Sequence, residues 1–553
     1  MGQVNSCQFE VWRQELCNLL WSAATLAFHQ QEVLKTLTAK LDWQTTNQFG
    51  ILDLANASWA LAKLQQDDFE VFHRLQKQLD CHLQDATPQQ LSNLAWAFAT
   101  VSIVDGVAGV DGVDGHTTMA RIANEAQDRI PQFSSQGLAN LVWALANQNV
   151  KCDAFFQAVG DRLVLKLDDC QGSDALAWAV DIAQIVKSFN DISFHHPCVS
   201  WSTHALPRVG SDLDRRLRAL EEIPTHPTQK LEKSDISDIS KSESVGSPKV
   251  LWESEDRCVL LKPPGWQVDT EGTEEDFIER THATREMLSQ FMASSYATVK
   301  YPILADIKCK NGFLHRLDVP SSGLILVAKK YNAYFDLLMQ LHRGEIHRDY
   351  LVLLHGLAQR KVVAVRLAKE ALTSWSGRQH VVKDFFHGNE KQGKKIKSLK
   401  KGKPSLTELR VGGWAATREG GSLSLAAIRI GSGRRHQIRV HMAHIGHPSV
   451  TDGRYTTEET FFEDQQWCER NFLHRFGIGF KDSDGLQSTI CELPEDLCAA
   501  LWQLRPWDMQ SAETMDLWQS IGPIDTEPTL SSLSSPLTWE DMPLLQKRAA
   551  CIP

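Results

Sequence analysis

A chain of 553 residues is too long for a single hydrophobic core, because domains typically span about 50–200 residues. With 42% hydrophobic and 23% charged residues, the composition excludes a disordered or fibrous protein. The net charge of −10, taken over the whole chain, argues against a nucleic-acid-binding protein. The 12 Cys are scattered without a C-x-x-C pair, which argues against a zinc ribbon or a disulfide framework and indicates a reducing, intracellular location.

The N-terminal segment shows no signal for secretion. No apolar run approaches the roughly 20 residues that cross a bilayer. The start MGQVNSCQFE has neither the basic nor the apolar region of a signal peptide, so we expect a soluble protein. The same start fits the pattern M-G-x-x-x-[ST], which leaves lipidation of Gly2 open.

Tryptophan marks a repeat in the N-terminal region. The blocks are LCNLLWSAATL, LANASWALAKL, LSNLAWAFATV, LANLVWALANQ and a degraded DALAWAVDIAQ. Their tryptophans are Trp21, Trp59, Trp96, Trp143 and Trp178, at spacings of 38, 37, 47 and 35 residues. The long interval contains the Gly-rich stretch VDGVAGVDGVDGHTT, which we interpret as an expanded loop. A fixed period with Leu and Ala at three- and four-residue steps predicts an all-α solenoid of helix pairs over residues 1–200.

An asparagine stands three residues before each of the first four repeat tryptophans. These residues are Asn18, Asn56, Asn93 and Asn140. We expect the Asn column to form structural hydrogen bonds between adjacent units rather than to contact a ligand. We expect the tryptophans to pack in the core rather than to stack on bases.

The L-x-N-x-x-W-A-x-A blocks resemble octotricopeptide-type repeats over residues 10–190. Such repeats occur in RNA-binding proteins of algae and related eukaryotes, so the resemblance implies that the array assists RNA binding. It also favours a mitochondrion or plastid, although the first residues lack an Arg-rich transit peptide, and cytoplasm and nucleus stay open. Armadillo-like arrays share the same pattern of burial, so a protein partner on the repeats is an alternative.

Two segments are expected to lack a fold. Residues 205–249 carry Pro, Ser, Lys and Asp with few large apolar groups, which predicts a flexible linker. Residues 506–553 are acidic and rich in Ser and Pro, which predicts a disordered tail.

The elements after the linker alternate between strands and helices. VLWESEDRCVLLKPPGWQV predicts a β-hairpin that ends in a rigid Pro-Pro-Gly loop. FLHRLD and LILVAKK predict two strands joined by a turn, which carries His315, Arg316 and Asp318. YNAYFDLLMQLHRGEI predicts an amphipathic helix and HRDYLVLLHG another strand. LSLAAIRI predicts a strand, followed by a Gly-rich turn and a helix that Gly446 ends.

Residues 250–505 resemble RluA-type pseudouridine synthases. HRLDVPSSG matches the family's H-R-L-D-x-x-[TS]-S-G motif, GSGRRHQIRVH matches its T-G-R-x-H-Q-I-R-V-H block, and FLHRFGIGF matches its closing L-H-A motif. The Lys-Pro-Pro-Gly hairpin precedes them in the family's order. The resemblance implies an α+β domain with a mixed, largely antiparallel sheet, an RNA substrate (ribosomal or transfer RNA), and no cofactor or metal. A Lys-rich insertion at about 385–404 interrupts the matched blocks.

The chemistry of pseudouridine formation needs a carboxylate near the anomeric carbon and a pocket that retains the cleaved base. By the resemblance, Asp318 is that carboxylate, acting either as nucleophile or as base. The resemblance also implies that Arg439 pairs with Asp318, because a buried carboxylate needs a cation. Tyr350 matches the aromatic residue that stacks on the flipped uracil and assists proton removal from its carbon 5, and Leu473 lines the same pocket.

Further polar residues of these motifs are expected to contact the RNA. They are His315, Arg316, Arg434, His436 and Gln437. Four residues depart from the family pattern, and we expect none of them to touch the carboxylate, the stacking tyrosine or its arginine. They are Arg348 for Lys, Asp349 for a small residue, Thr451 for Gly and Arg475 for Ala.

Three other interpretations are weaker. His436, His441, His444 and His447 suggest a zinc site, but no Cys or acidic residue stands at ligand spacing. HRLD resembles the kinase H-R-D loop, but neither G-x-G-x-x-G nor D-F-G accompanies it. A catalytically inactive RNA-binding or RNA-folding protein with the synthase fold stays an alternative.

The charge is distributed unevenly, and this changes what the whole-chain value implies. Residues 306–455 contain 27 Lys and Arg against 11 Asp and Glu, a net charge of +16, whereas the remainder carries −26. The basic segment contains the matched motifs and therefore suits contact with RNA.

For the oligomeric state, we expect a monomer.

Overall fold

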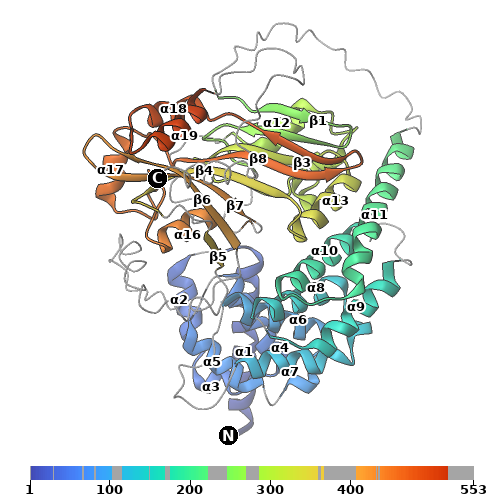
Figure 1. Ribbon diagram of the computed structural model, residues 1–553. Coiled ribbons are helices and arrows are strands. Elements are labelled where there is room, and N and C mark those ends of the chain that lie inside the picture. Colours follow the sequence, from blue (N-terminus) through green and yellow to red (C-terminus); the bar gives the residue numbers. More distant parts are fainter. Residues whose placement is uncertain are drawn as a thin grey trace, which may run out of the picture. The chain divides into compact units, whose positions relative to one another are not determined.

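The computed structural model divides the chain into two compact units, a helical unit of residues 1–209 and a sheet unit of residues 210–553. Each unit is described by itself below, and their elements are labelled in Figure 1. The structure describes residues 2–28, 30–64, 66, 68–79, 82–101, 115–148, 150–167, 175–221, 246–268, 286–358, 363–366, 406–430, 433 and 436–520.

The helical unit is built on five helices that stack in chain order, each packed on the next. They are α1 (Gly2–Thr25), α4 (Ile51–Lys63), α6 (Pro88–Val101), α8 (Ser135–Asn147) and α10 (Ala175–Asp191). Each contains one of the tryptophan blocks, and the predicted all-α fold of this region is confirmed. The helices between them are α2 (Gln31–Ala39), α3 (Trp43–Thr46), α5 (Phe69–Leu79), α7 (Gly115–Gln127) and α9 (Asp153–Leu167).

Small and aliphatic side chains form the contacts between the stacked helices. In α6, Leu91, Leu94 and Ala95 are fully buried, at the three- and four-residue steps of an apolar helix stripe. Backbone acceptors tie consecutive units together: Ser92 Oγ donates to the carbonyl oxygen of Gly137 at 3.0 Å, and Asn147 Nδ2 donates to that of Ala99 at 2.9 Å. These bonds satisfy buried carbonyl groups across the repeat boundary.

The repeat tryptophans lie at the margin of the core rather than fully inside it, so the expectation of core packing holds only in part. Trp59, Trp96 and Trp143 are each partly exposed, and Trp21 is 47% exposed. The buried stripe of Leu and Ala fills the contact between helices, and the Trp positions lie beside this stripe. The Asn positions one turn earlier share this partly exposed face, and Asn93 accepts a hydrogen bond from Gln89 of its own helix at 3.0 Å.

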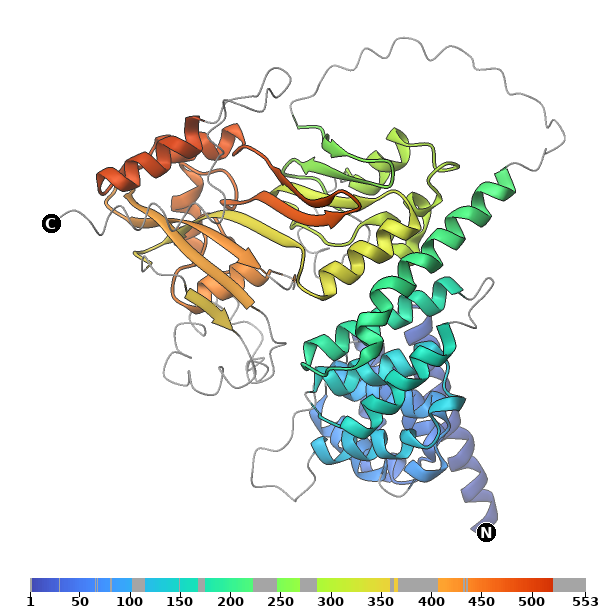
Figure 2. The same cartoon turned by 45° about the vertical axis from the view of Figure 1, so that its right-hand side comes forward.

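The sheet unit contains one twisted, ten-stranded sheet (Figures 1 and 2). Its main path runs β1-β2-β3-β8-β4-β7-β6-β10, with β5 paired to β6 and β9 to β8. Only β3 and β8 pair in parallel among these described strands, so the predicted mixed, largely antiparallel sheet is confirmed. The strands are β1 (Lys249–Glu253), β2 (Arg257–Lys262), β3 (Ser322–Ala328), β4 (His347–His355), β5 (Val363–Arg366), β6 (Leu406–Ala416), β7 (Ser422–Ile430), β8 (Leu473–Asp482), β9 (Gly485–Ile490) and β10 (Arg505–Pro506).

Short helices cover the sheet in two groups (Figure 1). Near β1, β3 and β8 lie α12 (Leu288–Ser295) and α13 (Tyr331–His342). Toward β6 lie α16 (Gln437–His444), α17 (Glu458–Gln465), α18 (Glu495–Trp502) and α19 (Met509–Ser520). The predicted strand over FLHRLD is wrong: Phe313 forms an isolated bridge with Val327, and residues 314–318 are irregular.

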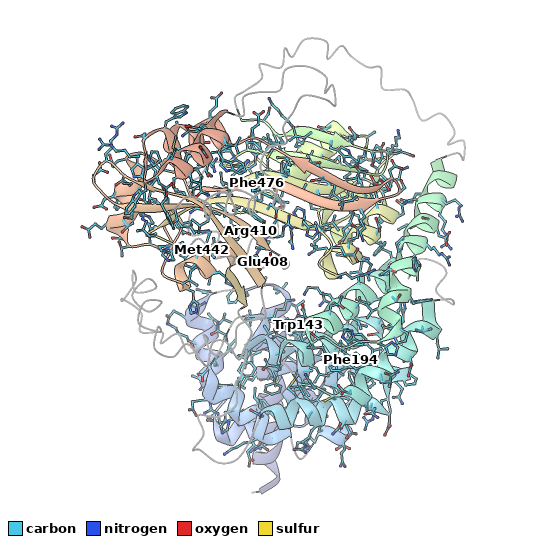
Figure 3. The ribbon with its side chains drawn as sticks, in the orientation of Figure 1. Trp143, Phe194, Glu408, Arg410, Met442 and Phe476 are labelled. Carbon is cyan, nitrogen blue, oxygen red and sulfur yellow. The ribbon has the colours of Figure 1, made fainter. Side chains whose placement is uncertain are left out.

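Helix α19 lies where the disordered tail was expected to begin, so the tail prediction was wrong for residues 506–520. Trp518 of this helix is 1% exposed, and its ring centroid lies 4.8 Å from that of Phe476 in β8, which Figure 3 labels. Two buried aromatic rings supply enough apolar area to fix a short helix despite its polar neighbours. The rest of the expected tail, residues 521–553, lies outside the described residues.

Helix α11 (Pro197–Glu221) likewise continues into the expected linker, so the linker prediction was wrong for residues 205–221. Within the sheet unit, the carboxylate of Asp214 accepts hydrogen bonds from the backbone N–H groups of Tyr331 and Asn332, each at 3.1 Å. A carboxylate at the first turn of α13 is favourable there. Residues 222–245 and the Lys-rich insertion at 385–404 lie outside the described residues.

Candidate active site

Asp318 lies on a turn whose carbonyl groups are all hydrogen-bonded. The Ser321 N–H closes the turn on the carbonyl oxygen of Asp318 at 3.0 Å. The Gly265 N–H donates to Val319 O at 2.9 Å, and Arg470 Nη1 donates to Pro320 O at 3.1 Å. This segment enters β3 directly, and the hydrogen bonds to its carbonyl groups fix the position of the carboxylate.

Lys262 ties the Pro-Pro-Gly loop to the same turn. Its Nζ donates to the carbonyl oxygens of Pro263 at 3.0 Å, Val319 at 3.1 Å and Ser321 at 2.6 Å, which uses all three ammonium protons. The side chain is fully buried. Burial and the nearby charge of Arg470 lower the pKa of Lys262 to about 7, against the opposing effect of Asp318.

Arg439 joins Asp318 to a second carboxylate. Its Nη1 donates to Asp318 Oδ2 at 3.1 Å, while its Nε and Nη2 donate to the two oxygens of Asp452 at 2.7 and 2.6 Å. Asp452 is fully buried. Burial alone would lower the pKa of Arg439, but the bonds and charges of Asp452 and Asp318 outweigh it and raise the pKa above its ordinary value. The predicted pairing of Arg439 with Asp318 is thus present in the structure.

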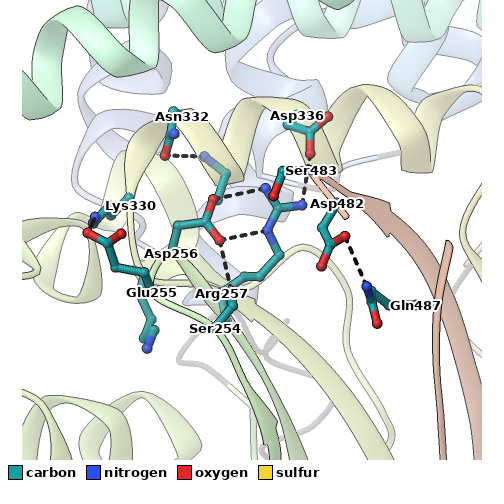
Figure 4. Close-up of polar contacts among 12 residues, drawn as sticks. Ser254, Glu255, Asp256, Arg257, Lys330, Asn332, Asp336, Asp482, Ser483 and Gln487 are labelled. Atoms are coloured by element: carbon teal, nitrogen blue, oxygen red, sulfur yellow. Dashed lines mark hydrogen bonds and ion pairs between the residues drawn. The ribbon is translucent and has the colours of Figure 1, made fainter. Parts of the chain in front are cut away.

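A second arginine, Arg257, begins β2 at the opposite end from Lys262 and has the same bidentate geometry; we call each such arginine with its two carboxylates a clamp. Arg257 Nε and Nη2 donate to the two oxygens of Asp256 at 2.9 and 3.0 Å, and Nη1 donates to Asp336 at 2.8 Å (Figure 4). The arrangement of two carboxylates around one arginine therefore occurs at both Arg257 and Arg439. Only the clamp of Arg439 includes Asp318.

His436, the residue just before α16, lies beside the carboxylate of Asp318. His436 adopts φ 52°, a left-handed conformation that non-glycine residues rarely take. Its Nδ1 lies 2.9 Å from the hydroxyl of Tyr455, and its Nε2 lies 3.9 Å from Asp318 Oδ2. Gln437, by contrast, is buried and donates to Thr407 Oγ1 at 3.0 Å.

Tyr350 of β4 is 3% exposed, and its hydroxyl is bonded to Arg475 of β8. Arg475 Nε donates to Tyr350 Oη at 2.9 Å, and Nη2 donates to the same oxygen. We expected that no residue that departs from the family pattern would touch Tyr350. Because Arg475 does so, that expectation was wrong. Strand pairing explains it, because β4 and β8 are neighbours that bring positions far apart in the sequence together.

His315 also contacts Arg475. Its Nδ1 lies 2.8 Å from Arg475 Nη1, which makes Nδ1 the acceptor and leaves the proton of the neutral ring on Nε2. Burial, followed by the charges of Arg475 and Arg348, holds the pKa of His315 well below its usual range. The ring is therefore neutral, and a contact of His315 with RNA would be a hydrogen bond rather than an ion pair.

Asp349 and Thr451, two of the other residues that depart from the family pattern, are held by hydrogen bonds. Asp349 accepts two hydrogen bonds from Arg429, at 2.6 and 2.7 Å, from the neighbouring strand β7. Burial lowers the pKa of Arg348 to about 10. Thr451 adopts φ 54°, where the family pattern has glycine, and it is held by hydrogen bonds to Asp464 and Cys468.

Of the remaining predicted site residues, Leu473 begins β8 and is 5% exposed, and the side chain of Arg316 is exposed. Arg434 lies outside the described residues. Among the described residues, no group of three or more His, Cys, Asp or Glu side chains could hold a metal ion. No helix in the described part of the chain is long and apolar enough to span a membrane.

Residues 257–444 match the family model of RNA pseudouridylate synthases. The matched segment lies within the sheet unit and resembles an RNA pseudouridylate synthase domain. Among curated proteins, the chain is 31% identical over 187 residues to ribosomal large subunit pseudouridine synthase C of Yersinia pestis, covering 33% of this chain and 51% of that protein. It is 29% identical over 199 residues to ribosomal large subunit pseudouridine synthase D of Nitrosomonas europaea, covering 35% and 51%. The chain thus spans about half the length of the curated relatives it matches.

Among solved structures, the chain is similar to Human RNA Pseudouridylate Synthase Domain Containing 1, with 22% identity and a TM-score of 0.32. That match covers 51% of this chain and 97% of the other. A second, Human RNA Pseudouridylate Synthase Domain Containing 4, has 15% identity, a TM-score of 0.30 and coverage of 46% and 93%.

Three residues of the synthase domain and its flanks were missed by reasoning from the sequence. Asp452 follows a matched block, and its buried pairing with Arg439 could have been suspected from the need for a second carboxylate. Lys262 belongs to the Lys-Pro-Pro-Gly motif, but nothing in the sequence shows that its ammonium group reaches the Asp318 turn. Arg475 was noted as a departure, and its contact with Tyr350 depends on strand register.

Proposed function

We propose that the protein converts uridine to pseudouridine in RNA, with Asp318 as the reacting carboxylate. The observation that carries this proposal is the ordered contact from Arg439 to Asp318 at 3.1 Å, because Arg439 is itself fixed by the buried Asp452. A preorganised cation compensates a carboxylate without costing reorganisation at the moment of reaction. The synthase domain around this contact supports the same chemistry.

The reaction requires no group that the chain does not supply. The bond between ribose C1′ and uracil N1 breaks, the base turns, and C1′ bonds to uracil C5. The proton leaves C5 and N1 gains one, so the product is an isomer. Asp318 acts at the ribose, as nucleophile or as base, and the Tyr350 ring stacks on the base while it turns.

Asp318→Asn tests this assignment, because the amide keeps the shape of the side chain and removes its charge. We expect the variant to bind RNA as the wild type does and to form no pseudouridine, measured by mass spectrometry on RNA transcribed in vitro. Glu419→Gln, on the turn between β6 and β7, is the matched control and should leave product formation unchanged. Pseudouridine formed by the Asn variant would contradict the assignment, and binding without product by the wild type would favour the inactive RNA-binding alternative.

The names of the curated relatives support ribosomal RNA as the substrate, with transfer RNA as the other candidate. The octotricopeptide-like blocks favour a mitochondrion or plastid as the compartment. Pseudouridine profiling of total and organellar RNA, before and after depletion of the protein, identifies both the RNA and its compartment. Unchanged profiles in every fraction would contradict the proposed substrate class.

For the helical unit, we propose that the partly exposed tryptophans stack on unpaired bases. Trp59, Trp96 and Trp143 recur on one face of successive stacked helices, and base stacking on an aromatic ring contributes about 1–3 kcal/mol per base. The charge favours a second candidate, a basic protein partner. Residues 1–209 hold 13 Lys and Arg against 22 Asp and Glu, a net charge of −9 that repels phosphate groups.

Crosslinking the full chain in cells separates these two partners. Ultraviolet crosslinks to RNA on peptides of α6 and α8, lost in Trp96→Ala and Trp143→Ala, would support base stacking. Crosslinks from the same helices to a basic protein, with RNA crosslinks confined to the sheet unit, would favour the protein partner. Thr100→Ala, at an exposed position of α6, is the control for a change on the same helix.

A further inference from the structure

We propose that Arg475 is a positioning residue that fixes the Tyr350 ring relative to the segment carrying Asp318. This inference rests on the proposed synthase function. Arg475 stands in FLHRFGIGF, where the family pattern L-H-A has alanine, so the contact belongs to this chain and not to that pattern.

The guanidinium of Arg475 is fully bonded inside the sheet unit. Its Nε and Nη2 both donate to Tyr350 Oη, the former at 2.9 Å. Its Nη1 donates to His315 Nδ1 at 2.8 Å and to Leu324 O at 2.9 Å, and Nη2 also donates to Arg316 O at 3.2 Å. All five N–H groups of the guanidinium therefore have acceptors. One side chain thus connects β8, β4, β3 and the residues just before Asp318.

Two N–H donors that converge on one phenolic oxygen restrict the tyrosine ring. A single bond would let the ring tilt about the acceptor, whereas the fork of Nε and Nη2 fixes the direction of Tyr350 Oη. The guanidinium carbon also lies 4.9 Å from the ring centroid. A ring that stacks on a turning base needs a fixed plane, since a displacement of about 1 Å at a reacting centre can cost about a hundredfold in rate.

The electrostatic cost of this arrangement argues for a function beyond stability. Arg475 is 1% exposed, and among the described residues its hydrogen bonds end on neutral acceptors. A buried guanidinium without a carboxylate costs several kcal/mol in solvation that alanine would avoid. Burial, followed by the charges of Arg475 and Arg348, holds the pKa of the neighbouring His315 well below its usual range.

The contact also couples Tyr350 to the reacting carboxylate. Arg475 holds His315 and the carbonyl group of Arg316, which precedes Asp318 by two residues. The turn beyond Asp318 is held separately, by Lys262 and Arg470. Arg475 is thus the link between the stacking ring and the N-terminal side of the Asp318 segment, and its loss should disturb their relative position.

Steady-state kinetics of Arg475→Ala and Arg475→Lys on an RNA that the wild type modifies test the inference. We expect Arg475→Ala to lower kcat about 10- to 100-fold per folded molecule and to leave KM within about threefold. Arg475→Lys should recover only part of kcat, because lysine keeps the charge but not the fork. A purely structural role would lower the folded fraction and the melting temperature while kcat per folded molecule stayed at the wild-type value, which would overturn the proposal.

A double-mutant cycle with Tyr350→Phe shows whether Arg475 acts through the tyrosine. We expect Arg475→Ala to cost less than about threefold in the Tyr350→Phe background, since the acceptor is already gone. Multiplicative losses would overturn the proposal. If Arg475→Ala does not fold, the same cycle with Arg475→Lys decides. An inactive wild type would instead overturn the proposed function and this inference with it, whereas active wild type with unaffected variants would overturn this inference alone.

Discussion

Arg439 and Asp452 form a bidentate ion pair, with Nε 2.7 Å from Oδ2 and Nη2 2.6 Å from Oδ1. Asp452 is fully buried, and the third donor of the same guanidinium reaches Asp318 at 3.1 Å. Asp452 therefore orders the arginine that contacts Asp318, the carboxylate that we propose to react. Removing the charge of Asp452 should then affect both folding and catalysis.

Asp452→Asn is expected to lower the free energy of unfolding by about 3 kcal/mol, because it leaves a buried guanidinium without its main counter-charge. It should also lower kcat about tenfold or more, since Arg439 would no longer present a fixed donor to Asp318. Urea denaturation and pseudouridine formation per folded molecule measure the two effects. A variant with wild-type kcat would contradict the role of Asp452 in ordering Arg439.

The matched control is Asp256→Asn in the clamp of Arg257, which has the same bidentate geometry. This variant should also lose stability, but by less, because the Asp256 side chain is 25% exposed. Its kcat per folded molecule should equal that of the wild type. Equal losses of kcat in Asp452→Asn and Asp256→Asn would show that kcat falls whenever either arginine loses its bidentate partner, and would contradict a specific role of Asp452.

Gly323→Ala should strongly destabilise the sheet unit. Gly323 has φ +123°, and an added Cβ would collide with the backbone of Arg475 on the paired strand β8. We expect a loss of at least about 3 kcal/mol, measured by thermal unfolding. Gly344→Ala is the control, because its φ of +72° is also strained but nothing lies within 4 Å, and it should cost only about 1 kcal/mol.

His474 makes the fold sensitive to acid. Burial, then the charge of Arg470, lowers its pKa from 6.5 to about 3, so the unfolded chain binds this proton at a higher pH than the folded one. The stabilisation is complete above pH 6.5 and is lost as the pH falls toward 3, on the order of 5 kcal/mol in all. His474→Asn should flatten the dependence of the unfolding free energy on pH in this window. The exposed His347 supplies the control, His347→Asn, and an unchanged slope in His474→Asn would contradict the assignment.

The sequence was sufficient for what depends on local pattern and motif order. The helix of YNAYFDLLMQLHRGEI, the strand of HRDYLVLLHG and the pairing of Arg439 with Asp318 are all present in the structure. The strand expected at FLHRLD failed because its residues bond to Arg475 instead of to a neighbouring strand. The partial exposure of the tryptophans was not predicted, because a helical period fixes which residues share a face but not how deeply that face is buried.

Contacts that depend on strand register could not be predicted. Arg475 and Tyr350 are 125 residues apart in the sequence, and only the pairing of β4 with β8 brings them together. Helix α19 was missed for a similar reason, since the burial of Trp518 depends on Phe476 of the sheet. A single sequence shows that an arginine replaces an alanine, but not which side chains the arginine reaches.

Lys262→Met tests whether Lys262 orders the Asp318 turn. We expect it to lower kcat while the unfolding free energy changes little. Methionine fills a similar volume but cannot donate to the carbonyl oxygens of Val319 and Ser321. We expect kcat to fall about tenfold or more as the turn loosens. The unfolding free energy at pH 7 should change by less than about 2 kcal/mol, because removal of a costly buried charge offsets the lost bonds.

The pH dependence supplies a second readout for Lys262. Its folded pKa of about 7 lies below the ordinary 10.5, so between these values the unfolded chain binds the proton that the folded chain has released. The unfavourable contribution of Lys262 is thus full below pH 7 and disappears as the pH rises toward 10.5. The wild type should therefore gain stability relative to Lys262→Met between pH 7 and 9.5, on the order of 3 kcal/mol. A constant difference between the two proteins across this range would show that the lysine is not buried as the structure has it.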